Sequence, residues 1–319
     1  MGTREFAVEI SPIICGTFEP EHFLCNNYIL RALNLKNEEF WQTSKRKIAF
    51  REKTLVMAIL NVTPDSFSDG GKFFSIDDAL RQAERFIEEG ADILDIGGES
   101  TRPNSARVSA EEELARVAPV IEAIVKRFDV PISIDTSKAE VAESAINCGA
   151  EIINDISGLR FDECIALIAS KYQTGLVLMH LRGTFETMHK LEPIKNILRE
   201  VSDGFRWSIE KATSYGVKNK QIALDVGIGF SKTFEQNLEL IAKLGKIIAE
   251  FPTFPMLVGV SRKSFIGNIL DDAPVSDRLN GTLAANAIAV WNGANIVRVH
   301  NVKETLETLK IVEALKNQL

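Results

Sequence analysis

The stretch Val56–Gly71, VMAILNVTPDSFSDGG, decides the fold. Its first five residues are all apolar, which is typical of a strand that is covered on both faces, as in a parallel sheet. Asn61 then lies at the carboxyl end of this strand, where parallel α/β folds carry their chemistry. Pro64 and the Gly70-Gly71 pair interrupt regular structure, so we expect the residues after Asn61 to form a mobile loop that closes over a ligand.

The same unit recurs from Leu55 onward: a short apolar run that ends in a polar residue, a loop, and an amphipathic helical pattern. The runs are VMAIL (56–60), ADILDIG (91–97), VPISID (130–135), AEIIND (150–155), GLVLMH (175–180), IALDVG (222–227), PMLVGVS (255–261) and NIVRVH (295–300). Helical patterns between them include Ile76–Glu89 and Ala110–Phe128. Strands that alternate with helices indicate a parallel sheet.

Eight such units match a closed (β/α)8 barrel, which takes about 250 residues. We therefore predict an α/β fold in which residues 55–319 form a TIM barrel and residues 1–54 an N-terminal extension of unknown role. An open doubly wound sheet is the alternative. Its usual phosphate-binding fingerprint, a glycine triplet in the first strand-helix turn, is absent, which disfavours it.

Composition excludes several classes of protein. The chain of 319 residues has a formal net charge of −7, which argues against a nucleic-acid partner. It contains no apolar run of the roughly 18 to 20 residues that a membrane span needs, and we expect no membrane partner and a cytoplasmic location. The four cysteines lack the spacing of a metal site and are expected to be reduced thiols: Cys15, Cys25, Cys148 and Cys164.

Polar residues gather where the predicted strands end, and closure of a barrel brings these ends together on one face. The residues at the strand ends, most of them polar, are Asn61, Glu99–Pro103, Asp135, Asn154, Asp155, Met179, His180, Asp225, Ser261–Ser264, Arg298 and His300. Carboxylates and amides can read the edges of a polar heterocycle, while Arg, Lys and His can take phosphate oxygens. The mixture suits a ligand with a heterocycle at one end and an anion at the other. Asn61 with substrate oxygens suits magnesium, which uses few protein ligands.

Several of these residues have a simpler structural interpretation. Asp135 precedes a helix start and could be a capping residue, and Asp155 could form a turn. If Asp155 faces the helix, then alternation points Asn154 into the barrel. His180 and Met179 could belong to the pocket or to the core.

Charged residues within the buried strands are harder to explain by packing alone. Lys263 and Arg298 lie at strand ends, where a buried charge needs a partner. Asp92, near the start of its strand, is expected to be structural, and the role of Asp95 stays open.

An ordered set of motifs resembles the dihydropteroate synthases, a family of pterin-binding TIM barrels. The motifs are NVTPDSFSDGG, GGESTRP, SIDT, NDISG, LDVGIGF, SRKSFIG, DRLNGTLA and RVH, and they run from about Met57 to the end of the chain. The resemblance implies a transferase of folate biosynthesis that condenses 6-hydroxymethyl-7,8-dihydropterin pyrophosphate with p-aminobenzoate, needs Mg²⁺ and acts as a homodimer.

The resemblance also implies the site residues. Asp135, Asn154, Met179, Asp225, Phe230 and Lys263 would bind the pterin, and Asn61, Arg102, Arg298 and His300 the pyrophosphate, with Asn61 on the metal. Phe67, Thr101, Pro103, Lys263 and Ser264 would line the p-aminobenzoate site. The catalytic residues would be Asp135, Asp225, Lys263 and Arg102.

The chain departs from the family pattern at five positions: Val226 and Phe185 stand where Pro is common, Ser231 and Asn104 where Gly is common, and Asn301 where Asp is common. None removes an implied ligand, although Phe185 could reshape the loop beside the pterin. Two rival functions remain. A corrinoid-linked pterin methyltransferase has no use for the anion site formed by SRKS and RVH. A pterin-binding paralogue without activity is disfavoured because all the expected site residues are present.

Overall fold

The computed structural model describes residues 40–63, 76–100, 105–188 and 191–318. The chain divides into Met1–Glu38 and a second, compact unit, Glu39–Leu319, to which the described residues belong. The expected mobile loop after Asn61, and the implied site residues Phe67, Thr101, Arg102 and Pro103, lie outside the described residues.

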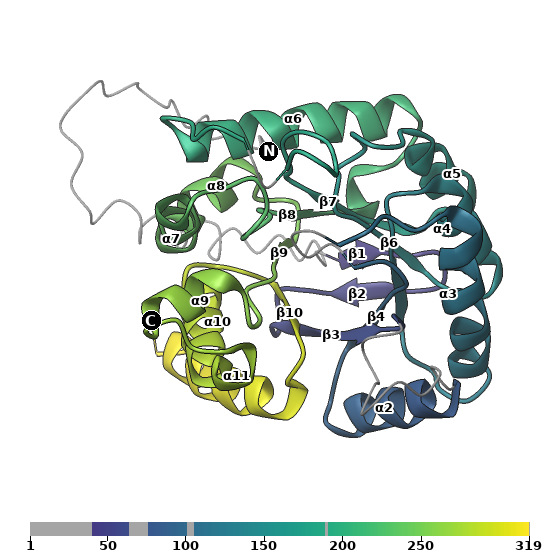
Figure 1. The fold of residues 1–319 in the computed structure, drawn as a ribbon, viewed down its shortest axis with the longest axis horizontal. Coiled ribbons are helices and arrows are strands. Elements are labelled where there is room, and N and C mark those ends of the chain that lie inside the picture. Colours follow the sequence, from purple (N-terminus) through teal and green to yellow (C-terminus); the bar gives the residue numbers. More distant parts are fainter. Residues whose placement is uncertain (1–39, 64–75, 101–104, 189–190, 319) are drawn as a thin grey trace, which may run out of the picture. The chain divides into compact units, whose positions relative to one another are not determined.

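Eight strands of the second unit form a closed parallel barrel in the order β10-β3-β4-β5-β6-β7-β8-β9, with the helices outside it (Figure 1). The strands are β3 (Leu55–Asn61), β4 (Ile93–Gly97), β5 (Ile132–Asp135), β6 (Ile152–Asp155), β7 (Gly175–Met179), β8 (Ile222–Asp225), β9 (Met256–Val258) and β10 (Ile296–Val299). The predicted TIM barrel is confirmed, and the open-sheet alternative is excluded because the last strand pairs with the first.

The described helices follow the strands in the predicted alternation. They are α2 (Ile76–Glu88), α3 (Ala110–Val125), α4 (Ala139–Asn147), α5 (Cys164–Tyr172), α6 (Ile197–Ser214), α7 (Phe234–Ala242), α8 (Leu244–Glu250), α9 (Ser264–Ile269), α10 (Leu279–Trp291) and α11 (Val302–Lys316), with short 3₁₀ turns at Asn219–Gln221 and Val275–Asp277. Ser109 caps α3 by accepting a hydrogen bond from the backbone N–H of Glu112. Within the described ranges, no helix combines the length and the apolar character needed to cross a membrane.

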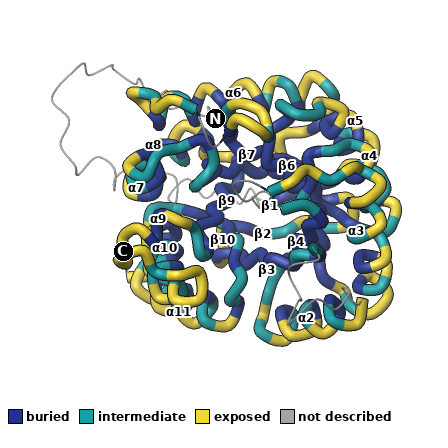
Figure 2. The backbone as a smooth tube through the Cα atoms, in the orientation of Figure 1, coloured by how far each residue is buried: buried dark blue, intermediate teal, exposed yellow. Residues whose placement is uncertain are grey.

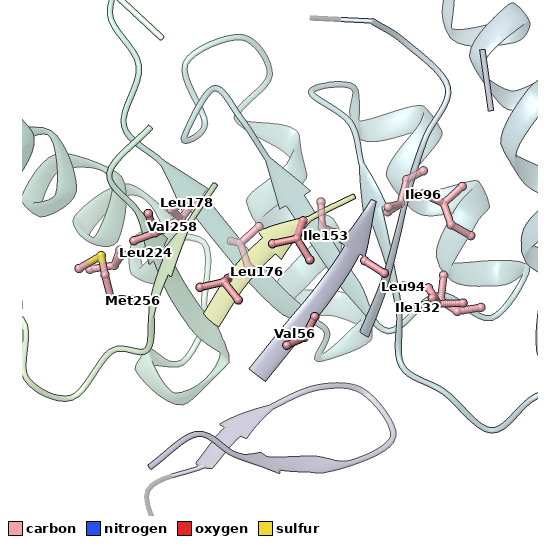
Figure 3. Packing of buried hydrophobic residues seen from close by; sticks show 14 of the residues in the cluster. Val56, Leu94, Ile96, Ile132, Ile153, Leu176, Leu178, Leu224, Met256 and Val258 are labelled. Atoms are coloured by element: carbon pink, nitrogen blue, oxygen red, sulfur yellow. The ribbon is translucent and has the colours of Figure 1, made fainter. Parts of the chain in front are cut away.

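Each barrel strand buries both of its faces, which explains why the strands are apolar without interruption. Outward side chains such as Val56, Leu94 and Leu176 pack under the helices in one large core (Figure 3). The burial pattern repeats around the ring, with buried strands inside and exposed residues on the outer faces of the helices (Figure 2).

A short hairpin closes the amino-terminal end of the barrel. Strands β1 (Phe40–Gln42) and β2 (Lys47–Ala49) pair antiparallel, and Trp41 of β1 is fully buried among the inward side chains of the barrel strands. The indole Nε1 of Trp41 donates to the backbone carbonyl of Gln221 at 2.7 Å. Arg46 forms an ion pair of 2.8 Å with the buried Glu151. The boundary expected at residues 54 and 55 falls between this hairpin and the first barrel strand.

Strand register places several predicted site residues at one level of the barrel. Asn61 is the register partner of Gly97, Gly97 of Asp135, and Asp135 of Asn154. Because registered residues of parallel strands point to the same face, these residues form a row at the carboxyl-terminal mouth.

Candidate active site

A charged network lies at the centre of the mouth. Arg298 of β10 donates from Nε to Asp95 Oδ2 at 2.5 Å and from a terminal nitrogen to Asp135 Oδ2 at 2.6 Å. The amide of Asn154 donates to the same oxygen of Asp95 at 3.0 Å. Four strands thus contribute one continuous set of hydrogen bonds. The second oxygen of Asp95 and the hydroxyl of Ser133 are buried and have no partner within the described residues, which leaves polar capacity for a ligand.

Burial sets the charge balance of this network. It raises the pKa of Asp135 to about 7, against the opposing effect of Arg298, and the neighbouring carboxylates of Asp95 and Glu113 add to the rise. Burial disfavours the charged form of Arg298, but Asp95 and Asp135 outweigh it and raise the pKa of the guanidinium. The guanidinium of Arg298 therefore stays charged and pairs with two carboxylates, and Asp135 can take up or release a proton near neutral pH.

A second group lies at the ends of β8 and β9. Asp225 accepts a hydrogen bond from the backbone N–H of Gly227 at 2.8 Å. Lys263 donates to the carbonyl of Ile228, and its Nζ lies 4.5 Å from the centroid of the Phe230 ring. Burial raises the pKa of Asp225 and lowers that of Lys263 to about 8. A carboxylate, an ammonium and an aromatic face therefore lie together.

An apolar wall continues from Phe230. Buried Met179, at the end of β7, clusters with Ile156, Leu181 and Met188, and Phe161, Phe185 and Phe230 pack against this cluster. A flat heterocycle with polar edges would find an apolar surface here and polar groups on the other strands.

The residues expected to bind the anion include two in the loops after β9 and β10. Ser261 Oγ lies 2.9 Å from His300 Nδ1, and the backbone N–H of His300 donates to the same hydroxyl at 3.3 Å. Arg262 has a left-handed backbone with φ of 58° and donates to Asn301 Oδ1 at 2.8 Å. This bond holds the loop of Lys263 and Ser264 against the loop of His300.

Three structural alternatives are now decided by contacts. Asp155 is fully buried and accepts hydrogen bonds from the backbone and hydroxyl of Ser157 and from Leu159, so it forms a turn, as one interpretation predicted. Asn154 points inward, as alternation predicted. The His180 ring lies outside the barrel interior, against Gly204 of α6, where a methyl group on that glycine would lie 2.5 Å from the ring.

Sequence reasoning left two residues of this region without a role. Asp95 accepts hydrogen bonds from both Arg298 and Asn154. The signal that could have identified it is its place two residues after Ile93 and two before Gly97, on the inward face of β4. Lys232 donates to the carbonyls of His180 and Phe230, and burial lowers its pKa to about 7. No sequence pattern indicated a role for Lys232, since it lies in a loop without periodicity.

A family model described as "Pterin binding enzyme" matches residues 57–300. The chain is 49% identical over 263 residues to the dihydropteroate synthase of Escherichia coli K12, a match covering 81% of this chain and 90% of the relative. It is 46% identical over 264 residues to the enzyme of Synechocystis, where the match covers 83% of this chain and 91% of the relative.

Solved structures agree with the sequence relatives. Dihydropteroate synthase of Clostridium difficile, solved in the presence of pteroic acid, is 44% identical with a TM-score of 0.78 and coverage of 83% of this chain and 97% of that chain. The Xanthomonas albilineans enzyme with 4-aminobenzoic acid is 36% identical, with a TM-score of 0.80 and coverage of 87% and 98%. With this fold and these relatives, the chain belongs to the pterin-binding dihydropteroate synthases, transferases that form the C–N bond of 7,8-dihydropteroate in folate biosynthesis.

Proposed function

We propose that the pterin of 6-hydroxymethyl-7,8-dihydropterin pyrophosphate binds in the barrel mouth between the two charged groups. Asp135 and Asn154 bind one side of the ring, Asp225 and Lys263 the other, and Met179 with Phe230 supplies the apolar wall. The observation that carries this assignment is the largely buried Asp95–Arg298–Asp135 network, because a fold gains little stability from a charge cluster that is mostly removed from water at an open barrel end.

The pyrophosphate would then lie toward Asn61, Arg298 and His300, with Arg102 from outside the described residues. Among the described residues, no three His, Cys, Asp or Glu side chains gather as metal ligands. Mg²⁺ does not require such a group, since it keeps several waters and binds through one or two protein oxygens and the phosphates. A Cβ on Gly97 would lie 3.7 Å from Asn61 Oδ1 and 3.5 Å from Asp135 Cβ, so the amide oxygen and the Asp135 side chain lie on the same side of this glycine. The residues fit the ion, which would neutralise charge on the leaving group.

The reaction is displacement at the exocyclic methylene carbon of the pterin. The arylamine nitrogen forms the new bond as the bond to pyrophosphate breaks, and the proton of the amine leaves with solvent. Arg298, His300 and Arg102 hold the negative charge that develops on the departing oxygen, a role typically worth about 3 to 4 kcal/mol per well-placed donor. Asp135 and Asp225 offset positive charge on the pterin. No side chain acts as a covalent nucleophile.

The p-aminobenzoate would enter beside Lys263 and Ser264, and the proposal completes its site with Phe67, Thr101 and Pro103. Ser264 begins α9 and is exposed, so it is accessible to a ligand from solvent.

Turnover tests the function directly. The protein is mixed with Mg²⁺, the pterin pyrophosphate and p-aminobenzoate, and dihydropteroate and pyrophosphate are measured. We expect equal amounts of both products and loss of turnover when the metal is chelated. Tight pterin binding without product would instead indicate a pterin-binding protein without activity.

The N-terminal extension, residues 1–54, is proposed to take no part in the chemistry, since every assigned residue lies after Met57. A shortened chain that begins at Glu39 keeps the hairpin and should retain turnover; a folded but inactive product would contradict this.

We also propose a cytoplasmic location, where the net charge of −7 and the lack of a nucleic-acid footprint suit a small-molecule enzyme.

A homodimer is proposed from exposed apolar side chains on two neighbouring helices. Ile288 and Trp291 of α10 are 51% and 45% exposed, and Ile311 and Leu315 of α11 are 64% and 56% exposed. The spacing of three and four residues puts each pair on one helix face. Helices α10 and α11 pack together, so the four side chains lie on adjacent elements. Such an apolar patch is typical of a surface that a second copy covers.

A further inference from the structure

The loops after β9 and β10 bring a serine and a histidine together at the mouth of the barrel. Val258 of β9 is the register partner of Val297 of β10. An equal step along both chains from this pair leads to Ser261 and His300. Ser261 Oγ lies 2.9 Å from His300 Nδ1. The contact therefore follows from the pairing of these two barrel strands and continues it beyond their ends.

The next residue of each loop makes a second link. The guanidinium of Arg262 donates to Asn301 Oδ1 from two nitrogens, at 2.8 Å and 3.3 Å. The backbone N–H of Arg262 donates to the hydroxyl of Thr282 on α10 at 3.0 Å. Ser261 and His300 thus lie in two loops that are already fixed to each other, which restricts the geometry of their contact.

The hydrogen bonds of Ser261 can be accounted for completely within the described residues. The side chain is 6% exposed, and its Oγ accepts a hydrogen bond from the backbone N–H of His300 at 3.3 Å. The hydroxyl also carries one hydrogen, and the acceptor that the described residues offer it is His300 Nδ1. A buried hydroxyl that donates to nothing is unfavourable, so the hydrogen goes to Nδ1.

This hydrogen bond selects the tautomer of the ring. A neutral imidazole has one nitrogen with a hydrogen and one with a lone pair, and the hydrogen bond made by one nitrogen decides the state of the other. Because Nδ1 of His300 accepts, the ring hydrogen lies on Nε2. An N–H at Nε2 can donate to a phosphate oxygen, whereas the other tautomer would turn a lone pair toward it.

We propose that Ser261 is a positioning residue that holds the neutral ring of His300 in the tautomer with its hydrogen on Nε2, ready to donate to the diphosphate group. The inference rests on the proposed function, which assigns His300 to pyrophosphate. Ser261 acts through His300 and not on the substrate. The hydroxyl fixes both the orientation of the ring and the nitrogen that donates.

The tautomer can be read from ¹H–¹⁵N correlation spectra of the protein labelled in its histidine rings. The chain has four histidines, and a His300→Gln variant identifies the signals that belong to His300. The spectra are recorded at about pH 8.5, roughly two units above the ordinary pKa of histidine, where an imidazole is neutral. In wild type we expect Nε2 to carry the hydrogen and Nδ1 to give the shift of a nitrogen without one.

Two substitutions separate the hydroxyl from the rest of the side chain. Ser261→Ala removes the hydroxyl and Ser261→Thr keeps it. The matched control is Ser208→Ala on α6, because Ser208 is 2% exposed and its hydroxyl donates to the carbonyl of Gly158 at 2.9 Å. This control also deletes a buried, hydrogen-bonded hydroxyl, but one that does not contact the histidine.

In Ser261→Ala we expect the two ¹⁵N shifts of His300 to move toward each other as the second tautomer becomes populated. Calorimetric titration with magnesium pyrophosphate should show an affinity that is roughly 5- to 30-fold weaker, since a hydrogen bond to a charged group is lost or misdirected. Ser261→Thr and Ser208→Ala should keep the wild-type shifts and the wild-type affinity.

A wild-type ring with its hydrogen on Nδ1 overturns the inference, even in an enzyme that turns over, and this measurement does not depend on the folding of any Ser261 variant. Ser261→Ala with unchanged shifts and unchanged pyrophosphate affinity overturns it as well. A wild type that shows the expected tautomer but neither binds pyrophosphate nor makes dihydropteroate overturns the proposed function, and with it the role assigned to the Nε2 hydrogen.

Discussion

At the scale of single residues, Arg298 decides the electrostatics of the barrel mouth. It is the partner of both Asp95, which is fully buried, and Asp135. Removing one member of a buried ion pair leaves an uncompensated charge and typically costs about 3 to 5 kcal/mol. Arg298 therefore contributes to the stability of the free protein, in addition to its proposed contact with pyrophosphate.

Asp225→Asn should weaken pterin binding about 10- to 150-fold, because a hydrogen bond to a charged group contributes about 1.5 to 3 kcal/mol. Calorimetric titration with a pterin measures the change. Asp155→Asn is the control, since Asp155 also ends a strand but accepts its hydrogen bonds within a turn. It should lose stability and keep pterin affinity. Equal pterin affinity in Asp225→Asn and wild type would refute the pocket assignment.

Asp135 gives the free protein a pH-dependent stability. Its pKa is raised to about 7 in the folded protein, against an ordinary value of 3.8, so the folded state holds the proton where the unfolded state has released it. The contribution to stability is present below the ordinary pKa and is lost as pH rises through about 7. The free energy of unfolding of wild type, relative to Asp135→Asn, should therefore fall as pH rises from 3.8 to about 7 and level off above that. Urea denaturation at several pH values measures it, and a constant difference would contradict the raised pKa.

At the scale of elements, the hairpin β1–β2 fills the amino-terminal end of the barrel, opposite the mouth. Trp41 packs a fully buried indole against the inward layer that includes Met57, Ile93 and Val177. The Nε1 donor is satisfied by the carbonyl of Gln221, so the burial leaves no unpaired polar group on this ring.

Trp41→Ala should lower the free energy of unfolding by about 3 to 5 kcal/mol, the usual effect of deleting a buried aromatic side chain. Below its melting temperature the variant should keep its KM for both substrates, because the floor lies opposite the mouth. Trp207→Ala on α6 is the control, since that indole is 41% exposed and should contribute much less. Equal melting temperatures of the two variants would rule out the sealing role.

At the scale of the whole molecule, closure of the barrel creates the site. Arg298 and Asp135 are 163 residues apart in the sequence, yet their side chains form one ion pair. They meet because β10 pairs with β3, which completes the ring. A site made in this way depends on the entire barrel. The exposed apolar face of α10 and α11 is the surface proposed to bind a second copy of the chain.

A variant with Ile288→Glu and Ile311→Glu should be monomeric if these helices form the dimer interface, since buried carboxylates without partners oppose association. Sedimentation velocity compares it with wild type, which is expected to sediment as a dimer. The control is Leu167→Glu on α5, where an equally exposed apolar residue, at 51%, lies on another helix. A monomeric wild type would contradict the proposed homodimer.

The sequence by itself determined the eight strands, the helices between them and the polar residues at the strand ends, because these depend on periodicity among near neighbours. Asn61, Asp135 and Asp225 each end a strand as predicted. Alternation also predicted that Asn154 points inward.

Only the tertiary structure decided which of these groups share partners. Asp95 joined the network because closure set the inward face of β4 only one strand away from Arg298, and no local pattern encodes a contact between strands so far apart in sequence. Trp41 became the floor of the barrel for the same reason, since its partners come from strands spread over the whole chain. The alternation of side chains along a strand depends only on residues that are neighbours in the sequence. Closure of the barrel, and the burial that shifts the pKa of Asp135, arise only when all eight strands are in register.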